Sequence, residues 1–195
     1  ISGSALSDSS GNAVIAFARA AVTTYRSNTS VSSLSSGYSN LELLGFDAIN
    51  AVGNSLANTI LGNDASNLID GGAGVDVLTG LGGNDLFRFS QLSDSLLGQH
   101  DRITDLQIGI DRIDGPSAVG LGRVRQVGAV SANNEVALQQ VLTASAFAAN
   151  GAAVFGFGSR TFLALNDSTA GFNATRDAII EITGYTGNLN QLAIV

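Results

Sequence analysis

The residues best suited to chemistry are Asp and Asn side chains that recur at every ninth position of residues 53–88. This stretch divides into four units, GNSLANTIL, GNDASNLID, GGAGVDVLT and GLGGNDLFR, each with glycine first, Asn or Asp sixth and a large apolar residue eighth. The sixth positions are Asn58, Asn67, Asp76 and Asp85, and the eighth positions are Ile60, Ile69, Leu78 and Phe87. Carboxylate, amide and backbone carbonyl oxygens are the ligands that calcium prefers. The pattern therefore predicts a calcium-binding repeat.

The length of the unit indicates the elements that would position these side chains. Nine residues are too few for a helical hairpin, and Gly, Asn and Asp favour turns over helix. We predict that each unit forms a six-residue turn followed by a three-residue strand. Calcium takes about six to eight oxygens, more than one turn supplies, so the sites should lie between stacked turns.

The last two units closely fit G-G-x-G-x-D-x-U-x, and the stretch resembles the RTX family of calcium-binding nonapeptide-repeat proteins. The resemblance implies an all-β fold with a right-handed parallel β-roll, a calcium-binding solenoid in which two units make one coil. It also implies Ca2+ ions held between turns that lie two units apart.

The resemblance assigns ligands to each site, as backbone oxygens plus the side chain at the sixth position. The first site would combine Asn54, Leu56 and Asn58 with Gly71, Ala73 and Asp76. The second would combine Asn63, Ala65 and Asn67 with Gly80, Gly82 and Asp85. The third would combine Gly72, Gly74 and Asp76 with Phe89, Gln91 and Asp94, and the fourth would use Leu81, Gly83 and Asp85 with side chains of the segment that follows.

Two departures from the family pattern affect these sites. Asn58 and Asn67 offer neutral amide oxygens, so the first two sites should bind calcium more weakly, and the alternative is that both residues only form Asx-turns without metal. Leu81 replaces a glycine and must point outward if its turn is to form.

Residues 87–114 (FRFSQLSDSLLGQHDRITDLQIGIDRID) resemble the segment that closes the β-roll in serralysin-type secreted proteins. The matching residues are Ser90, Ser93, Asp94, Ser95, Asp101, Ile103, Asp105, Gly109, Asp111, Ile113 and Asp114. By this match Asp94, Asp101 and Asp111 would complete the last calcium sites. The alternative is that Arg102 and Arg112 form salt-bridged turns with the preceding aspartates. His100 has no second His, Cys or H-E-x-x-H motif beside it, so we predict a solvated loop residue.

The remaining sequence divides into three predicted regions: an N-terminal extended segment over residues 1–40, the β-roll with its closing segment over 41–115, and a β-rich C-terminal region over 116–195. Residues 12–27 favour a strand, and residues 41–52 have the length of a further coil without a metal-binding turn. One helix is predicted over 133–149, followed by strands at 152–157, 160–166 and 178–183. Residues 160–189 resemble the bluetail domain of cyanobacterial surface proteins, and the ending GNLNQLAIV resembles a type I secretion signal.

Composition indicates an extracellular protein. The chain has 195 residues, a net charge of −7 and no cysteine, which argues against nucleic-acid binding and excludes disulfides and thiolate metal sites. No stretch approaches the roughly 20 apolar residues of a membrane span. The expected partners are calcium ions, and either a second copy through the solenoid edges or other surface components; nucleic acid and membrane insertion are not expected.

No catalytic motif accompanies the single histidine or the three glutamates, so we expect no enzyme activity. The sequence predicts a secreted calcium-binding structural module of a cell-surface or matrix protein, whose folding is triggered by extracellular calcium. The alternatives are a self-assembling extracellular filament or surface-layer subunit, and the non-catalytic C-terminal tail of a secreted hydrolase.

Overall fold

The four repeat units form the centre of a parallel solenoid in the computed structural model, which describes residues 6–7, 13–14 and 23–195. Each unit ends in a three-residue strand at its seventh to ninth positions, as predicted: β6 (Thr59–Leu61), β7 (Leu68–Asp70), β8 (Val77–Thr79) and β9 (Leu86–Arg88). Strand β6 pairs in parallel with β8, and β7 with β9, so consecutive strands lie in opposite sheets. Two units therefore make one coil, and the all-β prediction is confirmed.

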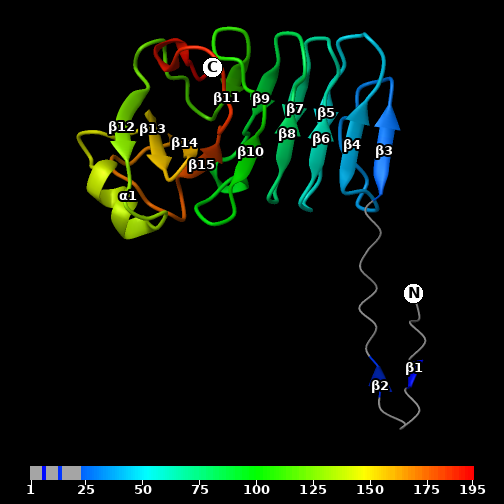
Figure 1. The fold of residues 1–195 in the computed structure, drawn as a ribbon, viewed down its shortest axis with the longest axis horizontal. Coiled ribbons are helices and arrows are strands. Elements are labelled where there is room, and N and C mark those ends of the chain that lie inside the picture. The colour runs from blue at the N-terminus through cyan, green and yellow to red at the C-terminus, as the bar shows by residue number, and fades with distance from the viewer. Residues whose placement is uncertain (1–5, 8–12, 15–22) are drawn as a thin grey trace.

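Further coils precede the repeat (Figure 1). Strands β4 (Asn40–Leu43) and β5 (Ala51–Val52) pair in parallel with β6 and β7, which makes residues 41–52 part of a coil as predicted. Strand β3 (Thr24–Ser27) then pairs in parallel with β4. Upstream, β1 (Leu6–Ser7) and β2 (Ala13–Val14) pair with each other, while the rest of the strand predicted over 12–27 lies mostly outside the described residues.

The closing segment adds one more strand to each sheet. A 3-10 turn, η1 (Leu92–Asp94), is followed by β10 (Asp101–Ile103), which pairs in parallel with β8. Strand β11 (Arg112–Asp114) then pairs in parallel with β9.

The C-terminal region extends the same sheet beyond the solenoid. Strand β15 (Ala178–Glu181) pairs in parallel with β10, and β14 (Arg160–Leu165), β13 (Ala152–Phe157) and β12 (Arg125–Ala129) follow outward. The result is one nine-stranded sheet, β12-β13-β14-β15-β10-β8-β6-β4-β3, that faces the four-stranded sheet β11-β9-β7-β5 over the solenoid. After Pro116 the chain leaves the coils for a region in which β13, β14 and β15 pair antiparallel, while the sheet itself continues.

The helix is shorter than predicted. The sequence predicted helix over 133–149, but α1 spans Glu135–Val141, with the Asn134 side chain accepting the Ala137 N–H as N-cap. The helix ends at the C-cap Leu142, whose φ of −92° and ψ of 53° lie outside the helical region. A separate turn follows, in which the Thr143 carbonyl accepts the N–H groups of Ala146 and Phe147.

The core consists of two columns of side chains that run along the solenoid. The column of the large sheet contains Leu41, Ile60, Leu78 and Ile103, and that of the small sheet contains Ala51, Ile69, Phe87 and Ile113, all at most 1% exposed. The eighth position of every unit therefore points inward. Near the C-terminus, Ile194 is also buried and bridges to Ile113, so the end of the chain packs against the last coil. A second apolar cluster, which includes Leu138 and Phe162, lies on the other face of the extended sheet under α1.

Candidate metal centre

The sixth-position side chains form two buried rows, one beside each sheet. In the first row, the Asn58 N–H donates to Asp76 Oδ1 at 2.7 Å and the Asp76 N–H donates to Asp101 Oδ1 at 2.8 Å. The second row is Asn67, Asp85 and Asp111, joined in the same way at 2.8 and 3.0 Å. All six side chains are buried. Each aspartate thus accepts a hydrogen bond from a backbone N–H group of the preceding coil.

The structure places Asp101 and Asp111 directly after the two repeat aspartates, where the family match expects them to complete the last sites. The alternative of salt-bridged turns is wrong. Arg102 approaches Glu181, at 4.0 Å, and within the described residues no arginine pairs with Asp101 or Asp111.

Two fully buried carboxylate oxygens in these rows lack any hydrogen-bond partner. They are Asp76 Oδ2 and Asp85 Oδ2, both fully buried. Each faces the first glycine of its own turn so closely that a Cβ at Gly71 or Gly80 would overlap it. A buried anionic oxygen without a partner is costly unless it takes up a proton or a cation. We call each of these glycines, with the carboxylate oxygen for which it leaves room, a glycine cradle. The unpartnered oxygens in the two cradles fit the role of cation ligands.

Burial also changes the pKa values of these carboxyl groups. Burial raises the pKa of Asp76 to about 7, of Asp85 to about 6 and of Asp101 to about 8, although backbone hydrogen bonds act in the opposite direction. Burial likewise raises the pKa of Asp94 and Asp111. Neighbouring carboxylates add to the effect in every case. A bound cation would reverse it, because cation binding favours the ionised form.

Asp70 and Asp105 also contribute to these centres, although the sequence predicted neither as a ligand. The Asp70 carboxylate accepts the Gly72 N–H at 3.0 Å and raises the pKa of Asp76 and Asp101. The Asp105 carboxylate accepts the N–H groups of Gly80 and Leu81, and it raises the pKa of Asp85. Asp105 could have been found from its place in the closing-segment match, whereas Asp70 stands at a ninth position that carries no repeat signal.

The turns that were predicted to share ions are stacked on one another. A Cβ at Gly72 would lie 2.9 Å from the Asn54 carbonyl oxygen, and one at Gly74 would lie 2.6 Å from that of Leu56. On the other edge, Gly83 lies over Ala65 in the same way. Leu81 has a φ of 70° and is 40% exposed, so it points outward as predicted.

Backbone carbonyls are needed for any ion in these centres. Among the described residues, no three His, Cys, Asp or Glu side chains lie close enough to one another to hold a metal. Other predicted carbonyl donors are Asn63, at the second position of an earlier turn, and Gly71, Ala73, Gly80 and Gly82, at the first and third positions of the later turns. Asp94 lies in η1, where its carboxylate accepts the Gln91 N–H at 3.1 Å.

Ser95 joins the first row to the C-terminal strands. Its buried hydroxyl accepts the Asp101 N–H at 2.7 Å and donates to the Ile179 carbonyl at 2.6 Å. Its own carbonyl accepts the Ile179 N–H at 2.7 Å. Ser95 thus follows Asp101 as the last acceptor in the first row of hydrogen bonds.

We expect Ser95→Ala to lower the free energy of unfolding by about 1–3 kcal/mol, because it leaves a buried N–H and a buried carbonyl without this partner. Urea unfolding measured in calcium would test this, with the exposed Ser93→Ala as the matched control. Equal stability of the two variants would contradict the role given to the hydroxyl.

The prediction that His100 is a solvated loop residue is wrong. Its side chain is 14% exposed, with Nε2 2.9 Å from the Arg160 guanidinium and 3.9 Å from Glu181. The ring meets Phe162 edge-on, and burial together with Arg160 lowers the pKa of His100. Since Arg160 pairs with the buried Glu181, this cluster attaches the closing segment to the C-terminal strands.

Asp167 and Asp177 lie in the connection between β14 and β15. Asp177 accepts the N–H groups of Asp167 and Asn173, and Asp167 pairs with Arg176 at 3.3 Å.

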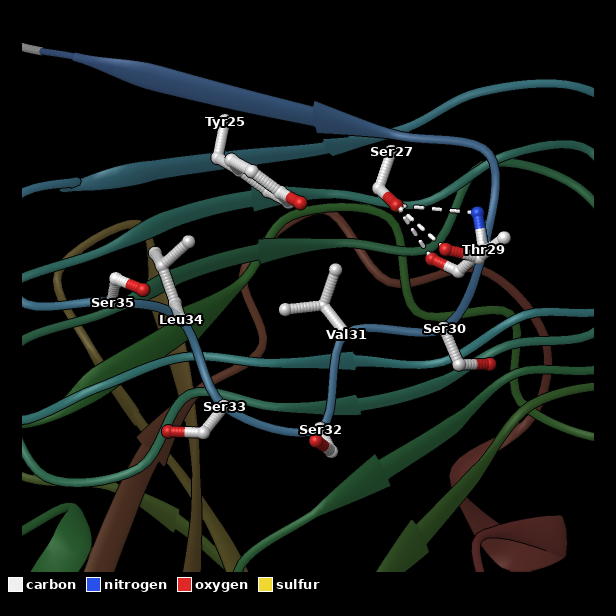
Figure 2. A pocket seen from close by; sticks show the side chains of 9 residues that line it. All are labelled: Tyr25, Ser27, Thr29, Ser30, Val31, Ser32, Ser33, Leu34 and Ser35. Carbon is white, nitrogen blue, oxygen red and sulfur yellow. Dashed lines mark hydrogen bonds between the residues drawn. The ribbon is translucent and has the colours of Figure 1, made fainter.

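The N-terminal end of the solenoid holds a pocket of about 240 Å³, shown in Figure 2. Tyr25 and Val31 continue the two core columns there, opposite Leu41 and Ala51, and Tyr25 is 39% exposed. Leu34 and serine and threonine side chains complete the lining, in which the described residues include no His, Asp or Glu. The pocket thus lies at the end of the solenoid core as far as the structure describes it, and the described lining has no acid–base pair.

Comparison with known proteins agrees with this arrangement. The family profile described as Peptidase M10 serralysin C terminal matches residues 6–148, well over half of the chain, including all four repeats and the closing segment. No curated protein matches the chain. Over the residues that the structure describes, none of the helices has the length and apolar character required to cross a membrane. The stacked nonapeptide coils, the closing segment and the profile match together place this chain in the serralysin C-terminal family, whose members are β-roll modules.

Proposed function

We propose that this chain is a secreted calcium-binding structural module whose folding is completed by extracellular calcium, within a cell-surface or matrix protein. The observation that carries the proposal is the pair of buried, unpartnered oxygens of Asp76 and Asp85, each held in a glycine cradle. The family is the non-catalytic C-terminal part of secreted serralysin-type proteins and binds calcium, which supports the same function.

Two centres would hold calcium. The first combines Asp76 and Asp101 with carbonyls of the stacked turns, and the second combines Asp85 and Asp111 with carbonyls on the other edge. When bound, calcium supplies positive charge that stabilises the ionised carboxylates. Each ion adds RT ln(1 + [Ca]/Kd) to the free energy of unfolding, about 2.7 kcal/mol at a hundredfold excess over Kd.

Calcium scarcity would keep the same segment from closing. Without the ion, burial and neighbouring carboxylates, Asp94 among them, raise the pKa of Asp76 and Asp101, and the glycines give the unfolded turns high conformational entropy. A chain with this property remains open inside a cell and closes outside it. The proposal includes type I secretion and a bluetail-type C-terminal region. Because the family profile matches only residues 6–148, these two features are supported by the sequence resemblance alone.

Small-angle X-ray scattering in calcium and in chelator would test the folding role. A folded 195-residue chain has an expected radius of gyration of about 16 Å, against about 47 Å for a fully unfolded one. We expect a clear increase in chelator that calcium reverses and magnesium does not. An identical radius under all three conditions would contradict the proposal.

Self-assembly is a second candidate, favoured by the N-terminal end of the solenoid. Among the described strands, β3 is the last of the nine-stranded sheet, and the pocket beside it exposes Tyr25. Exposed strand edges pair readily with other chains. Electron microscopy in calcium should show filaments or sheets if this candidate is correct. Monodisperse particles would instead favour a tail attached to a secreted hydrolase.

A further inference from the structure

The first repeat unit satisfies its sixth-position side chain without any ion. The Asn58 amide oxygen accepts the Asn54 N–H at 2.8 Å. The amide nitrogen donates to Asn54 Oδ1 at 3.1 Å and to the Ser39 carbonyl of the preceding coil at 3.3 Å. The NH2 group thus lies between two oxygens, one from each of two successive coils.

The second unit repeats this arrangement on the other edge. The Asn67 amide oxygen accepts the Asn63 N–H at 2.9 Å, and its nitrogen donates to Asn63 Oδ1 at 3.0 Å and to the Ile49 carbonyl at 2.7 Å. Both asparagines are 2% exposed. Two independent turns therefore use one hydrogen-bonding pattern.

The third and fourth units lack this pattern for two reasons. Their second positions are Gly72 and Leu81, which have no polar side chain, and the N–H groups of these residues donate instead to Asp70 and Asp105. A carboxylate at the sixth position also has no N–H to donate to the preceding coil. The inner oxygens of the two aspartates are consequently the ones without partners.

We propose that the amide NH2 groups of Asn58 and Asn67 take the place of calcium in the first two units. An NH2 group brings positive hydrogens to the carbonyl and side-chain oxygens that a cation would otherwise join, and it carries no net charge that must be compensated. These two units then close without the ion, and calcium dependence is confined to the units of Asp76 and Asp85. This inference rests on the proposed calcium function.

The double substitution Asn58→Asp with Asn67→Asp tests the proposal. A carboxylate there would face the Ser39 and Ile49 carbonyls oxygen to oxygen, so we expect the melting temperature in chelator to fall by about 5 °C or more. Calcium should restore it, and the variant should bind more calcium at saturation than the parent chain. The control is Asn84→Asp, which adds one such charge in a repeat turn but on an exposed side chain.

The opposite double substitution, Asp76→Asn with Asp85→Asn, should raise the melting temperature in chelator. It should also reduce the rise in melting temperature that calcium causes. An amide removes the buried charge and keeps an oxygen for the N–H of the preceding coil. The control is Asp64→Asn on an exposed side chain. Hydrogen exchange of the parent chain in chelator should protect the Asn54 and Asn63 amides, whose acceptors are the amide oxygens of Asn58 and Asn67, while the Gly72 and Asp76 amides exchange rapidly.

The outcomes separate this inference from the proposed function. If the parent chain responds to calcium but Asn58→Asp with Asn67→Asp behaves like Asn84→Asp, the inference is overturned and the calcium function stands. Uniform exchange of all four units in chelator would also overturn it. If the parent chain does not respond to calcium, the proposed function fails, and the inference fails with it.

Discussion

Replacing Gly80 by alanine is expected to remove calcium stabilisation from the second centre. The added Cβ would overlap Asp85 Oδ2 and lie 3.2 Å from the Phe87 ring. Since the carboxylate cannot move without breaking its contact with the Asn67 N–H, the turn must open or the carboxylate must leave the centre. Overpacking of this kind costs about 1–3 kcal/mol, and loss of one ion adds about 2.7 kcal/mol at a hundredfold excess of calcium over Kd.

Thermal and urea unfolding in calcium would measure this loss, with Gly82→Ala as the matched control in the same turn. A Cβ at Gly82 would meet its nearest atom, Asp64 Oδ1, at 3.5 Å, an ordinary contact. We expect the control to keep the stability and calcium response of the parent chain. Equal behaviour of the two variants would show that the glycine cradle is not needed for the fold or for the ion.

Acidification in chelator is expected to stabilise the protein, which is the opposite of ordinary acid denaturation. The buried carboxyls of Asp76, Asp85 and Asp101 have pKa values of about 7, 6 and 8 in the folded chain, above the ordinary value of 3.8. Between about pH 4 and pH 8 the folded state therefore binds more protons than the unfolded state, and its stability falls as the pH rises. Because one pKa unit corresponds to about 1.4 kcal/mol, we expect a gain on the order of a few kcal/mol from pH 8 to pH 5.

In saturating calcium the dependence should reverse. The bound ion holds these carboxylates ionised, so protons compete with calcium and stability should fall on acidification. Urea midpoints from pH 5 to pH 8, with and without chelator, would show both slopes. A chelator profile that rises with pH, or that is unchanged by Asp76→Asn with Asp101→Asn, would contradict the assignment of these groups.

The solenoid could be predicted because its determinants repeat. Glycine at the first position and an apolar residue at the eighth recur in every unit, and the strands fall at the predicted seventh to ninth positions. The columns of Ile60 with Leu78 and of Ile69 with Phe87 follow from pairing two units apart. Local turn chemistry and one buried face were sufficient for this part of the fold.

The details of the centres depend on tertiary contacts that no local pattern reveals. Asp70 contributes through its contact with Gly72, and Ser95 contributes because its partner Ile179 lies far along the chain. His100 is largely shielded from solvent because Arg160 and Phe162 of β14 lie against its ring. The choice between amide oxygen and amide NH2 at Asn58 was likewise set by the Ser39 carbonyl of the preceding coil.

Far-UV circular dichroism of the chelator-treated chain during a calcium titration tests the central claim most directly, with magnesium as the control ion. We predict a cooperative gain of β signal with calcium alone, and a much smaller gain for Asp76→Ala with Asp85→Ala. A spectrum that is fully folded in chelator and unchanged by calcium would contradict the claim that the ion completes this fold.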